Sequence, residues 1–253
     1  MNRFELIVLL NKTTTIKCIL NILQRDAGDI RIFGKQMKEA EIEVKEEIGV
    51  VFDDIQFPEP LNPSQINNFM KKLYKKWDST YYFELLEKFQ VPQKKTMKEL
   101  SRGMRMKLSL AVALAHHPKL LILDEPTSGL DPIIREEILD LFLDFMQDES
   151  HSILFSSHIT SDLEKIADYI TFIHQGKIQF SEEKDLLLEE YGIFRGDDQE
   201  LQAIPPTAIK GIRRNTYSVE ALVKRTEVNE FFTLEKPTIE EIMLFTVKEV
   251  TNR

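Results

Sequence analysis

The sequence predicts an α/β protein with a mainly parallel sheet. Short apolar runs alternate with amphipathic segments from the N-terminus to about residue 185. One run, "KLLILDEP" at 119–126, stays apolar until it ends in two acids, as expected of a central parallel strand buried on both faces. Strands that alternate with helical patterns favour crossover connections and therefore a parallel sheet.

The first elements in chain order are a strand at 6–10, a helix over 13–24 and a short strand after a turn at 27–29. The apolar run 48–52 predicts a buried strand, and prolines make 57–63 a loop. The segment 63–98 has a helical, polar-rich pattern. Its expected core residues are Phe69, Leu73, Trp77, Tyr82, Leu85 and Leu86.

The second half begins with an apolar helix over 108–116, followed by the strand at 119–126 and an amphipathic helix over 133–146. A buried strand at 151–158 and a helix over 161–168 follow. The segment 169–180 predicts a hairpin that turns at Gln175 and Gly176. Residues 190–253 are loop-rich at first, then contain short alternating segments at 217–223 and 230–234 and a helix over 238–249, which predicts a small α+β appendage.

Composition limits the possible functions. The chain has 253 residues, of which 42% are hydrophobic and 30% charged, enough for a large packed core. Its net charge of −9 argues against a nucleic-acid-binding face. Cys18 is the single cysteine, so no internal disulfide is possible and a reducing cytosol is expected. No apolar run approaches the roughly 18 residues of a membrane span, so any membrane part belongs to another chain.

The stretch "LIVLLNKTTTIKC" at 6–18 places a Lys-Thr pair between a strand and a helix. That order is the frame of a phosphate-binding P-loop, G-x-x-x-x-G-K-[ST], whose glycines let backbone N–H groups curl around phosphates. The glycines are absent, because the first glycine of the chain is Gly28. Taken alone, a Lys-Thr pair before a helix is more often a simple cap.

Asp124 and Glu125 end the strand "LLILDEP" and match a Walker B element. Asp124 would hold Mg²⁺, and Glu125 would polarise the attacking water. The alternative is a strand that ends in an ordinary polar turn, which a pair of acids alone does not exclude.

Further motifs decide between these interpretations. "LSRGM" at 100–104 precedes the Asp-Glu pair, "TSGLD" at 127–131 follows it, and His158 ends the next strand. In these motifs the chain resembles the ATP-binding cassette (ABC) ATPases, a P-loop NTPase family, over about residues 6–185. The resemblance implies an ATP-binding domain over 1–189, with a helical subdomain at about 63–115, and an appendage over 190–253.

The resemblance also implies roles for single residues. Lys12 is similar to the lysine that reaches the β- and γ-phosphates, and Thr13 to the hydroxyl that binds Mg²⁺. Thr14 would lie at the helix N-terminus near the α-phosphate. His158 resembles the histidine that contacts the γ-phosphate and orients the water, whereas a lone strand-end histidine would otherwise be structural.

Ser101 and Gly103 resemble the family's signature residues, which close on the γ-phosphate of a partner subunit's ATP. Asp131 resembles the D-loop aspartate that helps lock two such subunits together. The resemblance therefore implies a dimer in which each site takes residues from both ATPase subunits.

Three features depart from the family. Arg102 stands where the family prefers glycine, and Met104 where it prefers glutamine. Asp53, in "VFDD", replaces a usual glutamine; it is either a further ligand of Mg²⁺ or its water, or a plain turn residue.

The third departure is the phosphate loop. One residue separates Leu10 from Lys12, whereas a P-loop needs a loop of about eight residues that ends in the Lys and the Ser or Thr. Either the loop is truly absent and ATP is not bound in the usual way, or residues are missing from the printed sequence at this point. We favour missing residues, because the other motifs have no obvious purpose without ATP.

We expect the ATPase subunit of a bacterial ABC transporter that uses ATP and Mg²⁺ and drives transport, with a lean to export, through a separate transmembrane permease subunit. It would lie in the cytoplasm at the inner face of the membrane and pair with a second ATPase subunit, identical or different. The loop 52–66 would face the membrane subunit. Two alternatives stay open: a soluble ABC ATPase that transports nothing, and a degenerate scaffold that does not hydrolyse ATP.

Overall fold

The computed structural model describes residues 5–9, 12–53, 57–216 and 218–247, and for residues 5–9 and 12 it describes the backbone alone. Contacts between Cα atoms divide the chain into two compact units, 1–159 and 160–253. Residues 160–189, which the sequence assigned to the ATP-binding domain, thus group with the C-terminal residues. The boundary of the functional domain at 189 stays a prediction.

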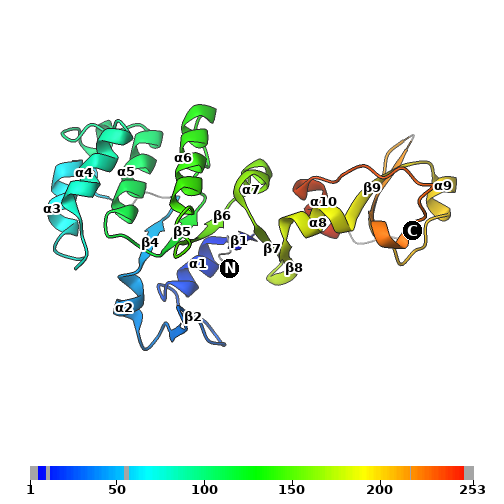
Figure 1. Ribbon diagram of the computed structural model, residues 1–253, viewed down its shortest axis with the longest axis horizontal. Coiled ribbons are helices and arrows are strands. Elements are labelled where there is room, and N and C mark those ends of the chain that lie inside the picture. The colour runs from blue at the N-terminus through cyan, green and yellow to red at the C-terminus, as the bar shows by residue number, and fades with distance from the viewer. Residues whose placement is uncertain (1–4, 10–11, 54–56, 217, 248–253) are drawn as a thin grey trace. The chain divides into compact units, whose positions relative to one another are not determined.

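Four parallel strands form the sheet of the first unit (Figure 1). They are β1 (Glu5–Leu9), β4 (Ile48–Val51), β5 (Leu120–Asp124) and β6 (Ser152–Ser156), in the spatial order β4-β5-β6-β1. Strand β5 lies between two neighbours, and its central residues are fully buried, which explains its continuous apolar run. The carboxyl ends of β5 and β6 lie in register, with Asp124 opposite Ser156.

Helix α1 (Lys12–Ile19), hairpin β2 (Arg31–Ile32) with β3 (Lys35–Gln36), and helix α2 (Glu41–Lys45) pack beside this sheet. The predicted end of the first helix at residue 24 is wrong. Asn21 adopts a positive φ of 57°, which ends a helix. Ile22 and Leu23, which lie within the predicted helix, are exposed and so gain nothing from continuing it.

The helical part contains α3 (Pro63–Met70), α4 (Ser79–Lys88), the short 3₁₀ helix η1 (Met97–Glu99) and α5 (Arg102–Leu114), with α3, α4 and α5 as neighbours (Figure 1). Asn62 and Gln65 form a capping box on α3, which fixes the helix start. Phe69 and Leu73 were expected in the core, but each is 56% exposed. Only the opposite face of α3, with Ile66 and Met70, is buried.

Helix α6 (Pro132–Phe145) connects β5 to β6, as predicted. Its Phe142 is fully buried and meets Phe155 of β6 edge to face, with ring centroids 5.9 Å apart. This contact anchors α6 on the sheet, so that the loop between Asp124 and Pro132 has both ends held.

The second unit begins with α7 (Thr160–Ile166) and the hairpin β7 (Tyr169–His174) and β8 (Lys177–Glu183), which turns at Gln175 and Gly176 as predicted. Helix α8 (Lys184–Glu190) leads to an antiparallel sheet in the order β10-β11-β9. Its strands are β9 (Tyr191–Gly196), β10 (Ile209–Arg214) and β11 (Val219–Lys224). Helix α9 (Asp198–Gln202) lies between β9 and β10 in the chain. The 3₁₀ helix η2 (Arg225–Glu227) and helix α10 (Ile239–Val247) follow β11.

The loop-rich interpretation of the residues after 190 is wrong where β9, α9 and β10 form, and no strand forms at 230–234. In β9 the Arg195 guanidinium meets the carboxylates of Glu220, Glu235 and Glu241. These partners are distant in sequence, so the local pattern did not show them. Among the described residues, no helix combines the length and apolar character that crossing a membrane requires.

Candidate nucleotide-binding site

Asp124 lies at the carboxyl end of β5 and is 1% exposed. Its Oδ1 accepts a hydrogen bond from Oγ of Ser156, over 2.7 Å, and its Oδ2 accepts one from Oγ1 of Thr13, over 2.6 Å. These two hydroxyl donors come from β6 and α1. The carboxylate is therefore desolvated but satisfied, and it joins three elements of the first unit.

The ligands at Asp124 suit Mg²⁺, which prefers oxygen and is usually held by one or two carboxylates together with water and substrate phosphates. The Asp124 carboxylate and the Thr13 hydroxyl already lie within 2.6 Å of each other. In the described part of the chain, no group of three or more His, Cys, Asp and Glu side chains could hold a metal. A magnesium ion bound here would take its remaining ligands from water and phosphate.

Glu125 directly follows the strand with a backbone φ of 53°, the left-handed region that costs a non-glycine residue about 1–2 kcal/mol. Its N–H donates to the carbonyl oxygen and to Oγ of Ser156, over 3.0 and 3.1 Å. These bonds hold the strained turn. The strain turns the Glu125 side chain away from the direction that a continuing strand would give it.

The Glu125 carboxylate meets His158, which follows β6. Oε2 of Glu125 accepts hydrogen bonds from Nδ1 of His158, over 2.6 Å, and from its N–H, over 3.3 Å. The Glu125 side chain is 16% exposed and that of His158 is 62% exposed. An oriented carboxylate with a histidine beside it at the protein surface is an arrangement suited to general base chemistry.

The signature turn, residues 101–104, begins α5. Ser101 is the N-cap, and its Oγ accepts from the N–H of Met104 over 3.2 Å. A Cβ at Gly103 would lie 3.2 Å from Cγ2 of Ile134 on α6, so the absence of a side chain lets these helices approach. Asp131 caps α6 by accepting from the N–H groups of Ile133 and Ile134.

Asp53 and Arg102, two of the departures from the family pattern, contact each other. Nη2 of Arg102 donates to Oδ1 of Asp53 over 2.7 Å. Both side chains are about half exposed. The role of Asp53 as a magnesium ligand stays a prediction.

The segment that should form the phosphate loop is short. Strand β1 ends at Leu9 and α1 begins at Lys12, so two residues connect them. Those two residues and the Lys12 side chain lie outside the described part. Thr14 is exposed in the first turn of α1, as a phosphate-facing residue must be. That residues are missing from the sequence at this point stays a hypothesis.

Ser156 was not predicted as a site residue, although it bonds to both Asp124 and Glu125. Its signal was the polar end of the strand at 151–158, since parallel neighbours bring their carboxyl ends together. Ile55, expected to face a membrane subunit, lies outside the described residues, and Phe57 and Leu61 are half-buried.

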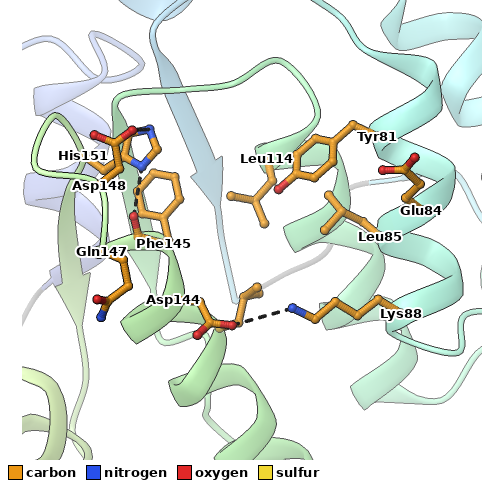
Figure 2. Close-up of a pocket in the computed structure, with 11 residues that line it drawn as sticks. Tyr81, Glu84, Leu85, Lys88, Leu114, Asp144, Phe145, Gln147, Asp148 and His151 are labelled. Atoms are coloured by element: carbon orange, nitrogen blue, oxygen red, sulfur yellow. Dashed lines mark hydrogen bonds and ion pairs between the residues drawn. The ribbon is translucent and has the colours of Figure 1, made fainter.

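A pocket of about 810 Å³ lies among α4, α5 and α6 (Figure 2), and neither Asp124 nor Glu125 lines it. Its wall includes Tyr81 and His151, and the His151 ring stacks on Phe145 with centroids 4.1 Å apart. An ion pair between Lys88 and Asp144 crosses one side of it (Figure 2). None of the predicted site residues lines this pocket, so it is separate from the candidate nucleotide site.

Comparison with known proteins gives the family. The ABC transporter family model matches residues 11–128. The lantibiotic transport ATP-binding protein SrtF of Streptococcus pyogenes is 32% identical over 176 residues, which are 69% of this chain and 75% of SrtF. This chain belongs to the ABC transporter family of ATP-binding proteins.

Two further ABC relatives are longer. The ABC transporter ATP-binding protein YtrB of Bacillus subtilis is 33% identical over 182 residues, covering 71% of this chain and 61% of YtrB. The bacitracin transport ATP-binding protein BcrA of Bacillus licheniformis is 35% identical over 170 residues, covering 66% of this chain and 55% of BcrA. The matches thus span less than two thirds of the length of each of these proteins.

Solved structures confirm the predicted fold. An ATP-binding subunit of an ABC transporter matches with a TM-score of 0.63 and 24% identity, over 74% of this chain and 81% of that one. An ATP-binding cassette solved as a dimer with ADP and Pi matches with a TM-score of 0.62 and 18% identity, over 72% and 88%. At these identities the likeness shows the fold alone, which is the α/β P-loop NTPase fold of ABC ATPases.

Proposed function

We propose that this chain is the ATP-hydrolysing subunit of an ABC transporter and that it drives export through a separate membrane subunit. The observation that carries the proposal is the pairing of the Glu125 carboxylate with His158, beside the buried carboxylate of Asp124. These are the groups that phosphoryl transfer to water requires: a metal-binding acid, a group that accepts a proton and a group that orients the phosphate.

In the proposed mechanism Glu125 accepts the proton of the attacking water through its carboxylate. His158 holds that carboxylate and would contact the γ-phosphate. Asp124 and the Thr13 hydroxyl would hold Mg²⁺, which supplies charge neutralisation at the phosphate oxygens. Lys12 and Thr14 would contact the phosphates from the start of α1. Ser156 positions both acids, because it bonds to the Asp124 side chain and to the backbone of Glu125.

The partners follow from the same proposal. Ser101, Gly103 and Asp131 would face the ATP of a second ATPase subunit, so catalysis would need an identical or a related second copy. A transmembrane permease subunit would hold the pair at the inner face of the membrane. The names of BcrA and SrtF refer to bacitracin and lantibiotic transport, which supports a role in transport; export is the direction that we propose. We propose no nucleic-acid partner.

Co-purification tests the proposal. The chain carrying an affinity tag, expressed in its own cell at native level, is extracted in mild detergent and its bound proteins are identified. We expect a multi-spanning membrane protein in a fixed ratio to the chain. Recovery of the chain from the cytosol, with no membrane protein bound, would contradict the transporter and favour a soluble ABC ATPase.

A second candidate function is a scaffold that binds partners without hydrolysing ATP. The specific observation in its favour is the two-residue connection between β1 and α1, which is too short to wrap a triphosphate. The intact mass of the natural protein separates the two candidates. A mass above the 29.6 kDa of the sequence by several residues would restore the loop, whereas a mass of 29.6 kDa together with no binding of ATP would favour the scaffold.

A further inference from the structure

Asp53 and Arg102 are 49 residues apart in the sequence and form an ion pair. Asp53 follows β4, and Arg102 is the first residue of α5. Each is a departure from the ABC pattern at its own position, and the two departures meet in one contact. Independent substitutions at two positions would not by themselves bring the two side chains into contact, so we treat Asp53 and Arg102 as one feature.

A third segment takes part in the contact. Gly129, in the loop after β5, has a φ of 65°. A Cβ placed there would lie 3.0 Å from Cζ of Arg102 and 3.2 Å from its Nη1. The guanidinium therefore occupies the space beside Gly129, and Arg102 contacts both Asp53, after β4, and the loop after β5.

The contact cannot be explained by its contribution to stability alone. Both side chains are about half exposed, and ion pairs at such positions contribute little to the free energy of unfolding. Their effect is on position. Arg102 directly follows the N-cap Ser101 and precedes Gly103, the two residues proposed to approach a partner's phosphate.

We propose that Asp53 and Arg102 form one positioning unit, which fixes the signature turn against the loop at 127–131 and neutralises the Asp53 carboxylate, which the predicted magnesium site would bring near the phosphates. The proposal rests on the proposed function for its consequence in catalysis. Without Arg102, the carboxylate of Asp53 would lose its counter-charge, and if Asp53 faces the nucleotide as predicted, that charge would repel the phosphates. Without Asp53, the Arg102 side chain would lose the partner that holds it over Gly129.

Hydrogen exchange on the full chain without nucleotide tests the positioning. Relevant amides are those of Met104, which bonds to Ser101, and Leu130, which bonds to the Thr127 carbonyl. We expect Arg102→Gln and Asp53→Asn each to speed exchange of these amides about 3- to 10-fold, and the double variant to be no faster than either single variant. Effects that add in the double variant, or unchanged rates, would overturn the proposal.

The chain contains a matched control pair. Lys88 and Asp144 form an exposed ion pair 3.7 Å long across the pocket of Figure 2. Lys88→Gln and Asp144→Asn should leave the exchange of Met104 and Leu130 unchanged. If these control variants speed it equally, the effect is a general loss of surface charge and the positioning unit is refuted.

ATP turnover in the assembled transporter tests the charge argument. We expect Arg102→Gln to lower kcat/KM for ATP about 3- to 10-fold through a raised KM. Arg102→Lys should retain most of the wild-type kcat/KM. The double variant Asp53→Asn/Arg102→Gln should recover only part of the activity, because it removes the unpaired carboxylate but does not restore the position of the signature turn. A double variant worse than Arg102→Gln would contradict the proposal. If the wild type shows no turnover, the proposed function fails, and the exchange experiment still decides whether the pair positions the turn.

Discussion

Ser156 donates a hydrogen bond from its Oγ to Oδ1 of Asp124 on the neighbouring strand, over 2.7 Å. Both residues are buried to 1% exposure, and the same Oγ accepts from the Glu125 N–H. One hydroxyl thus supports the side chain of one acid and the strained backbone of the next. The site depends on a residue that has no direct chemical role in the proposed reaction.

Replacing Ser156 by Ala should destabilise the protein by about 1–3 kcal/mol, because Asp124 Oδ1 and the Glu125 N–H lose a partner in a buried place. Urea unfolding followed by circular dichroism measures the loss. Ser152→Ala, a half-buried serine at the start of the same strand, is the control and should cost less. Equal losses for the two variants would mean that the bonds at Ser156 have no special weight.

The backbone strain at Glu125 predicts an unusual order of stabilities. Glycine adopts a φ of 53° without penalty, whereas alanine does not. Glu125→Gly should therefore be more stable than Glu125→Ala by about 1 kcal/mol, although glycine normally loosens a chain. The difference in urea midpoint between the two variants checks this. A Glu125→Ala variant at least as stable as Glu125→Gly would show that the turn relaxes.

Substitutions at two glycines with positive φ allow the cost of backbone strain to be measured apart from the cost of a clash with Arg102. Gly28 has a φ of 81° and open space at its Cβ position, whereas a Cβ at Gly129 would meet Arg102 at 3.0 Å. Both Gly→Ala variants incur about 1–2 kcal/mol for the left-handed backbone. Gly129→Ala should cost more, and Gly129→Ala in an Arg102→Gln background should cost about as much as Gly28→Ala. The free energies of unfolding of these variants test the contact directly.

His116 predicts a loss of stability in mild acid. Its ring is buried and stacked on Tyr74, with centroids 4.1 Å apart, and its Nε2 lies 3.0 Å from the carbonyl oxygen of Ile48. Burial lowers the pKa of His116 below its usual value. The unfolded chain therefore binds the proton more readily than the folded chain. The stability that this group contributes is complete above the unfolded-state pKa of about 6.5 and is lost as the pH falls below that value.

The free energy of unfolding should fall by up to about 1.4 kcal/mol per pH unit below about pH 6 on account of this group. The measurement is urea unfolding between pH 7.5 and 5. His116→Gln should flatten the slope, whereas His117→Gln, at a half-exposed neighbour, should keep it. A wild-type slope unchanged by His116→Gln would place the acid sensitivity elsewhere.

The order of strands and helices in the first unit could be predicted because its signals are local. The apolar run before Asp124 and the helical spacing after Pro132 need no knowledge of partners. The proximity of Asp124, Glu125 and His158 could also be predicted, since residues at the ends of neighbouring parallel strands must share one edge of the sheet. Their placement at that edge follows from topology.

What could not be predicted depends on contacts across long sequence distances. The ion pair of Asp53 with Arg102 joins segments that only the folded sheet brings together. Phe69 and Leu73 follow a helical period, but the period alone does not say which face of α3 is covered. Strand β9 was missed because the residues after 190 are loop-rich and polar in sequence, and the three carboxylate partners of Arg195 come from later segments.

We propose that Glu125 of this chain activates water for ATP hydrolysis in a transporter. The most direct measurement is phosphate release by the chain assembled with its membrane subunit, wild type against Glu125→Gln. We predict turnover by the wild type that falls about 10²- to 10⁴-fold in Glu125→Gln, the usual effect of removing a general base, while ATP still binds. Turnover that is the same in both, or that is absent from a wild-type complex of verified mass, would contradict it.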